Sequence, residues 1–128
     1  MKLKFPVILW AVTFALVLAF APRAHARPAA QDAAIVDTAT TALALHTVPG
    51  AMEANPMGFP ASIIGKIAIL AYMETMTPEE RAPVEALASS AWTGAAVNNL
   101  LIIAGASTIA MPMGIFTFLV LWLEDENE

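Results

Sequence analysis

The stretch VEALASSAWTGAAVNNLLIIA, residues 84–104, decides the fold class. It is apolar almost throughout, and Glu85 is its single charged residue. A helix that crosses the hydrocarbon core of a membrane needs about 20 such residues. Three further apolar stretches lie at about 33–48, 59–76 and 107–123. The sequence therefore predicts an all-α integral membrane bundle of four transmembrane helices.

The composition agrees with this prediction. Hydrophobic residues make up 59% of the 128 residues and charged residues only 13%, whereas a soluble domain carries roughly a quarter charged residues. A chain of this size has too little interior to bury so much apolar surface. It also has no cysteine, which excludes disulfides and thiol chemistry. Its few basic residues form no patch that would bind nucleic acid.

The first 26 residues resemble a secretory signal peptide. Lys2 and Lys4 form a basic start, residues 5–21 an apolar middle, and AHA at residues 24–26 a small-x-small cleavage site. We expect cleavage after Ala26. The alternative is an uncleaved anchor, which would give five apolar segments instead of four.

The signal also predicts the localisation and orientation. Its basic start stays in the cytoplasm, so we expect a multi-pass membrane protein. The mature N-terminus and the acidic tail, residues 124–128, then lie on the outer side of the membrane. The transmembrane domain spans residues 27–123.

Prolines and capping residues mark the expected helix ends. Thr77 is a candidate N-cap, Pro78 suits the first helical position, and Glu80 can complete a capping box. Pro83 is expected to interrupt the helix, so that residues 78–82 form a separate interfacial turn. Pro112 is expected to kink the last helix near its start.

The connection between the first two helices contains the motif Glu53-Ala54-Asn55-Pro56. We interpret it as a polar turn in which Asn55 caps the second helix and Pro56 lies near that helix's start. The alternative is that Glu53 forms a carboxylate site at the membrane surface.

Several polar residues interrupt the predicted membrane helices: Asp37, Thr41, Lys66, Asn98 and Asn99. A charge in hydrocarbon is costly, so such residues face the bundle interior and pair with one another. The favoured interpretation is a polar network that holds the helices together. Two alternatives are that Lys66 extends to the inner interface with Glu53 as its partner, and that these groups relay protons or ions.

Small residues indicate where helices pack closely. Ser90 and Gly94 are four residues apart and lie on one face of the third helix together with Asn98. Small side chains at this spacing let a neighbouring helix approach. We therefore expect a packing surface at Ser90 and Gly94.

The sequence contains no recognisable catalytic or metal-binding motif. His46 has no second histidine at a metal-ligand spacing, and no phosphate-binding loop or GxSxG sequence is present. The sequence therefore predicts no enzyme activity, no metal and no cofactor.

The pattern resembles the bacterial domain-of-unknown-function family DUF 5658. The resemblance rests on Asp37 with Thr40-Thr41, on the Glu53–Pro56 motif, on Lys66, and on Asn98 or Asn99, and it covers about residues 33–103. It implies a small multi-pass protein of the bacterial inner membrane, whose outer side is the periplasm. It also supports one constellation of residues: Asp37, Glu53, Asn55, Pro56, Lys66 and Asn98. It implies no activity.

Three functions fit these features. The first is a non-catalytic accessory or scaffolding subunit, whose partners are the lipid bilayer and either another membrane protein or further copies of itself. The second is an oligomeric conduit for protons, ions or a small solute that uses Asp37 and Lys66. The third is a holin-like pore-former, which is disfavoured because the tail is acidic where a basic tail is expected.

Overall fold

The computed structural model describes residues 29–52 and 57–125. These residues form four helices and no strand: α2 (Ala30–Thr47), α3 (Phe59–Met73), α4 (Pro78–Ile103) and α5 (Ser107–Asp125). The predicted all-helical class is therefore confirmed. The expected signal peptide, the Glu53, Asn55 and Pro56 motif, and the last three residues of the acidic tail lie outside the described residues.

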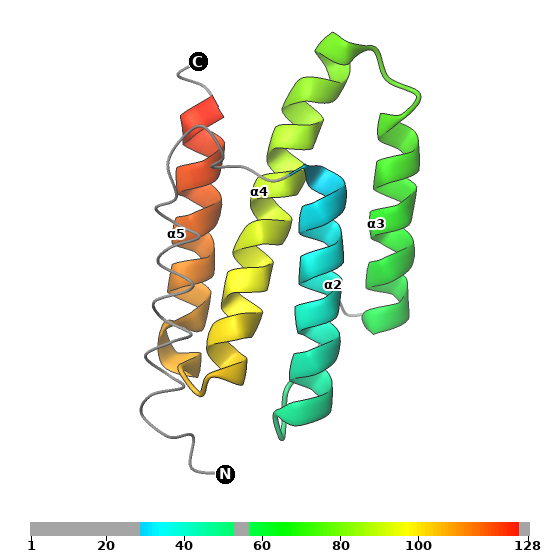
Figure 1. The fold of residues 1–128 in the computed structure, drawn as a ribbon. Helices are drawn as coiled ribbons and strands as arrows, with labels where there is room; N and C mark the ends of the chain where they lie inside the picture. The colour runs from blue at the N-terminus through cyan, green and yellow to red at the C-terminus, as the bar shows by residue number, and fades with distance from the viewer. Residues whose placement is uncertain (1–28, 53–56, 126–128) are drawn as a thin grey trace.

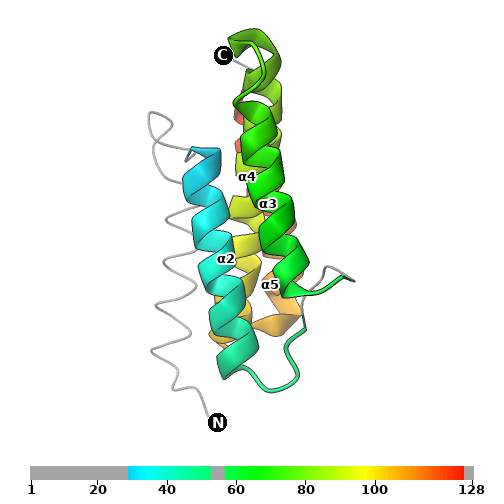
Figure 2. The same ribbon diagram turned by 90° about the vertical axis from the view of Figure 1, so that its right-hand side faces the viewer.

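The helices stand side by side, and each runs antiparallel to the one before it (Figure 1). Most contacts between helices join α4 to α5 and α4 to α2, whereas α3 touches α2 and α4 at few positions. Figure 2 shows α3 at the edge of the bundle, beside α2 and in front of α4. The central helix is therefore α4, which contains residues 84–103 of the deciding stretch.

The start of α4 agrees with one expectation and corrects another. The capping box is confirmed: the Thr77 amide donates to Glu80 Oε2 at 3.0 Å, and the Glu80 amide donates to Thr77 Oγ1 at 3.4 Å. The predicted break at Pro83 is wrong, because α4 runs without interruption from Pro78 to Ile103. Pro83 lies close to the helix start, and it removes only the hydrogen bond to the carbonyl of Glu79. That residue is exposed, so water can satisfy its carbonyl.

Thr77→Ala is expected to lower the unfolding free energy by about 1 kcal/mol, because the first turn of α4 loses its side-chain cap. The loss can be measured by SDS titration of the purified protein, with circular dichroism as the readout. Thr77→Ser keeps the hydroxyl and should behave like the wild type. Equal losses in the two variants would contradict the capping role.

The start of α3 differs from the expectation. Asn55 was expected to cap this helix with Pro56 near its start, but the N-cap is Gly58 and Pro60 lies in the first turn. Gly58 has a φ of +88°, which favours a residue without Cβ. Proline in a first turn loses no intrahelical hydrogen bond. The helix therefore starts at Gly58-x-Pro60 and not at Asn55-Pro56.

A glycine turn joins α4 to α5. The Ala106 amide donates to the Leu101 carbonyl at 2.8 Å, and the Gly105 amide donates to the Ile102 carbonyl at 3.0 Å. With a φ of +81° at Gly105, these bonds form a Schellman motif. The turn reverses the chain so that α5 packs back along α4. Val97, Leu101 and Ala110 form a small apolar core where the two helices meet.

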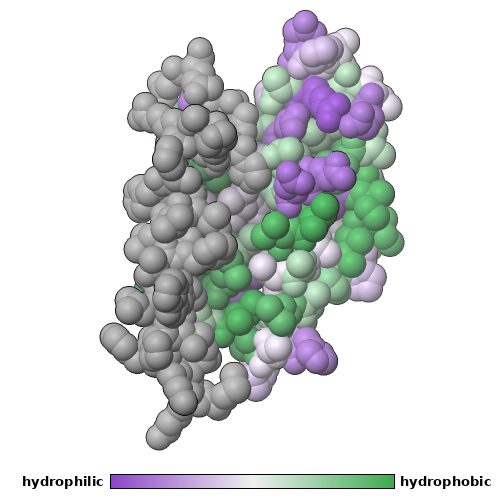
Figure 3. Space-filling model, in the orientation of Figure 1, coloured by the Kyte–Doolittle hydropathy of each residue, from purple (hydrophilic) through white to green (hydrophobic). Residues whose placement is uncertain are grey.

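Within residues 29–52 and 57–125, two helices are long and apolar enough to cross a membrane, α4 and α5. The apolar α3 has 15 residues, fewer than a usual span. Figure 3 shows hydrophilic side chains gathered at the end of the bundle where the chain turns from α3 into α4. Hydrophobic side chains cover the middle of the face that α2 and α3 form. The outer surfaces of all four helices carry large exposed apolar residues, among them Ile35, Ile64, Leu87 and Phe116.

Candidate functional site

A buried ion pair joins α2 to α3. Lys66 Nζ lies 2.8 Å from Asp37 Oδ2, and the two side chains are only 9% and 8% exposed. Lys66 Nζ also donates to Thr38 Oγ1 at 3.2 Å. Because each charge neutralises the other, both groups can lie inside the bundle at much lower cost than either alone. The pair provides a polar link to α3, the helix with the fewest contacts.

Asn99 of α4 completes the site from the other side. Its Nδ2 donates to Asp37 Oδ1 at 3.1 Å, to Thr41 Oγ1 at 2.8 Å and to Thr40 Oγ1 at 3.3 Å. The Thr41 hydroxyl also donates to Asp37 Oδ1, at 3.4 Å. One carboxylate therefore contacts α3 through Oδ2 and α4 through Oδ1. We call Asp37, Thr38, Thr40, Thr41, Lys66 and Asn99 the Asp37 network.

The local sequence of α2 explains why this helix is at the centre of the network. Asp37, Thr40 and Ala44 are buried and recur at helical spacing on one face. The same face continues through Ala30, Ala33 and Ala34. Small side chains allow α2 and α4 to approach closely, which brings Asn99 within hydrogen-bond distance of Asp37.

The two asparagines have different roles, which the sequence did not separate. Asn98 lies next to α5, since a Cβ built on Gly114 would be 3.0 Å from its Cβ. Its only hydrogen bond among the described residues is a long one, from Nδ2 to Asn99 Oδ1 at 3.5 Å. Adjacent residues point about 100° apart around a helix, so only one of them can face α2. Asn99 therefore faces α2, whereas Asn98 lies next to α5.

Asn99→Ala is expected to lower the unfolding free energy by about 2 kcal/mol, because the Asp37 carboxylate loses a hydrogen-bond donor. The matched control is Asn98→Ala, which should cost less than about 1 kcal/mol because it removes only a long contact. Both values can be measured by SDS titration. A larger loss in the control than in Asn99→Ala would show that the wrong asparagine has been assigned.

Two network residues, Thr38 and Thr40, were not among the polar candidates chosen from the sequence, although Thr40 belongs to the motif that carries the resemblance. Thr38 accepts from Lys66, and Thr40 accepts from Asn99 while it donates to the carbonyls of Val36 and Asp37. Threonine is common in helices of this kind, so its presence alone was no signal. The sequence feature that could have indicated them is the presence of three threonines within the four residues that follow Asp37 in an apolar stretch.

The predicted packing surface lies at the contact between α4 and α5. Ser90 is fully buried, and Gly94 lies directly against Gly114. A Cβ on Gly94 would be 2.5 Å from the Gly114 carbonyl oxygen, and a Cβ on Gly114 would be 2.7 Å from the Gly94 carbonyl oxygen. Two backbones therefore meet where neither residue has a side chain. The sequence indicated Gly94 but not its partner Gly114.

The remaining candidate residues lie apart from this site. His46 is exposed at the end of α2. In the described part of the chain, no group of three or more His, Cys, Asp or Glu residues could hold a metal ion. Glu53, the alternative partner of Lys66, lies in the segment that is not described.

Comparison of the chain with protein-family models, with curated proteins and with solved structures finds no match to any of them. The chemistry of the site is therefore argued from its own residues. The Asp37 carboxylate bonds to the Lys66 ammonium of α3 and to the Asn99 amide of α4, and three threonines of α2 bond to these groups. Such an arrangement fixes the relative positions of the helices.

Proposed function

We propose that the chain is a small multi-pass protein of the bacterial inner membrane that acts as a non-catalytic accessory or scaffolding subunit of a membrane assembly. The observation that carries the proposal is the Asp37 network, which joins α2, α3 and α4 inside a bundle whose outer surface is largely apolar. Polar residues in a membrane are expensive unless they hold helices together or serve a pathway.

The proposal includes four membrane helices after removal of residues 1–26, with the acidic tail on the periplasmic side. Support comes from the arrangement of the bundle. The apolar α4 and α5 are each long enough to span, and α2 and α3 stand beside α4 (Figures 1 and 2). If α4 crosses the bilayer, its neighbours share the same depth, and their exposed Ile35, Leu43, Ile64 and Ile69 face lipid.

A structural role accounts for the contacts better than a conduit does. Both oxygens of Asp37 are bonded to neighbouring helices, and Lys66 bonds to Asp37 and Thr38. Groups that hold one another in this way support a rigid bundle. Asp37, Thr40, Thr41, Lys66 and Asn99 of the network are among the residues on which the resemblance to DUF 5658 rests.

The proposal can be tested by cell fractionation followed by native mass spectrometry. The tagged chain should remain with membranes after an alkaline wash, and its mass should correspond to a mature form that starts at Arg27. Gentle extraction should yield a complex with a constant stoichiometry. A chain found in the soluble fraction would contradict the membrane assignment. A chain that forms a closed homo-oligomer without any other partner and shows ion flux in liposomes would replace the scaffold by a conduit.

A further inference from the structure

The seam between α2 and α3 is an open groove. An outer cavity of about 400 Å³ lies at the start of α2, and an inner cavity of about 400 Å³ lies deeper along the seam. Gln31, Ile67 and Leu70 line both cavities, so the two adjoin. The groove exists because α2 and α3 contact each other at few positions.

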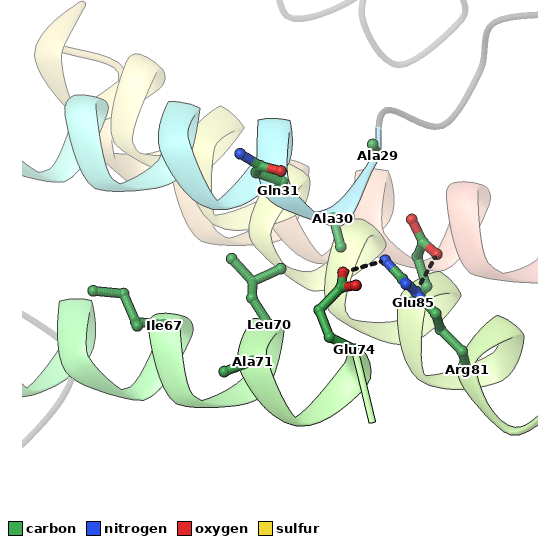
Figure 4. A pocket seen from close by; sticks show the side chains of 9 residues that line it. All are labelled: Ala29, Ala30, Gln31, Ile67, Leu70, Ala71, Glu74, Arg81 and Glu85. Atoms are coloured by element: carbon green, nitrogen blue, oxygen red, sulfur yellow. Dashed lines mark ion pairs between the residues drawn. The ribbon is translucent and has the colours of Figure 1, made fainter. Parts of the chain in front are cut away.

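The inner part of the groove is apolar. Ala34, Ile35, Ile63 and Ile67 line it, and Lys66 and Thr38 of the Asp37 network also contribute to its wall. Figure 4 shows Leu70 projecting from α3 toward α2, with Ile67 about one turn away along α3. A narrow apolar slot between two helices suits a single hydrocarbon chain, which would bury the apolar surface that these residues expose.

The outer end carries charges of both signs. Arg81 Nη2 lies 2.9 Å from Glu74 Oε1, and Arg81 Nε lies 3.5 Å from Glu85 Oε2. Figure 4 shows the guanidinium between the two carboxylates, beside the first residues of α2. A guanidinium has five N–H donors, so these two contacts leave further donors for an anion.

The start of α2 adds a second feature that attracts an anion. Its N-cap, Ala29, provides no side-chain hydrogen bond to the first turn, and Ala29, Ala30 and Gln31 line the outer cavity. The first amides of a helix have no intrahelical acceptor and carry partial positive charge. Phosphate groups bind at such helix starts, particularly where an arginine lies opposite.

We propose that this groove binds one phospholipid whose headgroup carries both a phosphate and a primary ammonium, as in phosphatidylethanolamine. The phosphate lies between Arg81 and the start of α2, the ammonium donates to Glu74 and Glu85, and one acyl chain follows the seam toward Lys66. A primary ammonium fits these carboxylates because it has N–H donors, which a quaternary ammonium lacks. This inference rests on the proposed membrane location.

Lipid selection can be measured with the full-length protein in nanodiscs that contain equal amounts of phosphatidylcholine, phosphatidylglycerol and phosphatidylethanolamine. Lipids retained after release into detergent are counted by native mass spectrometry. The wild type should retain about one phosphatidylethanolamine per chain. Arg81→Gln should lower that retention about tenfold, because the phosphate loses a charged donor. Glu79→Gln removes a charge from the same helix end outside the groove and should have no effect.

A second pair of variants tests the acyl-chain slot. Leu70→Trp fills the groove and should also abolish retention, whereas Ile69→Trp, at an exposed position that lines neither cavity, should retain the lipid. Circular dichroism checks that each variant is folded. Should Leu70→Trp fail to fold, Arg81→Gln still decides the matter.

Three results would overturn the inference. These are equal retention of the three lipids, preference for phosphatidylglycerol or phosphatidylcholine, and unchanged retention in Arg81→Gln. Failure of the proposed function can be distinguished from failure of the lipid inference alone. A chain that fractionates with soluble proteins contradicts both proposals. A membrane-bound chain that selects no lipid removes only this one.

Discussion

Lys66→Met is expected to lower the unfolding free energy of the bundle by about 3 to 5 kcal/mol, the largest effect of any single substitution considered for this chain. The variant leaves the Asp37 carboxylate inside the bundle without the ammonium that lies 2.8 Å away in the wild type. Methionine fills a similar volume, so the loss reports on charge and not on a cavity. The measurement is SDS titration of purified protein, followed by circular dichroism.

The control for this experiment removes both charges. In Asp37→Asn/Lys66→Met, the amide at position 37 can still accept from Asn99, and no buried charge is left alone. Replacing both members of a buried pair is often close to neutral, so the double variant should recover most of the stability. A Lys66→Met protein as stable as the wild type would show that the ion pair does not hold α3 in place. Recovery in the double variant would show that the single loss comes from the unpaired carboxylate.

The second large effect is expected at the contact between α4 and α5. Gly94→Ala should lower the unfolding free energy by about 2 to 3 kcal/mol, because the new Cβ would be 2.5 Å from the Gly114 carbonyl oxygen. The neighbour is backbone, which cannot rotate away as a side chain would. The two helices must therefore move apart at this contact. The same titration measures this loss.

Gly65 provides the matched control, since it is a helical glycine whose added Cβ would meet nothing within 4 Å. Gly65→Ala should be neutral or stabilising by up to about 1 kcal/mol, because alanine favours a helix over glycine. Gly114→Ala should destabilise as Gly94→Ala does, and the double variant should lose less than the sum, because helices already forced apart accommodate the second methyl. Equal effects at Gly65 and Gly94 would mean that helix propensity, and not the close approach, accounts for the loss.

Much of the fold follows from local features of the sequence. The apolar stretches and the Thr77-Pro78-x-Glu80 signal give the helical class and the start of α4, because hydrogen bonds within a helix and its cap depend on residues close in sequence. Pro83 was misjudged for a related reason. Its effect depends on its distance from the helix start, and the true start at Pro78 places it where the helix can continue.

The sequence by itself determined which residues need partners. A charge among apolar residues must be paired, so Asp37 and Lys66 could be singled out without any coordinates. Only the tertiary structure decided who the partners are. The rotation of α4 about its own axis selects Asn99 over Asn98, and the crossing of α4 and α5 places Gly114 against Gly94. Both depend on how whole helices pack, which is the sum of many contacts between residues far apart in the chain, and no short motif records that sum.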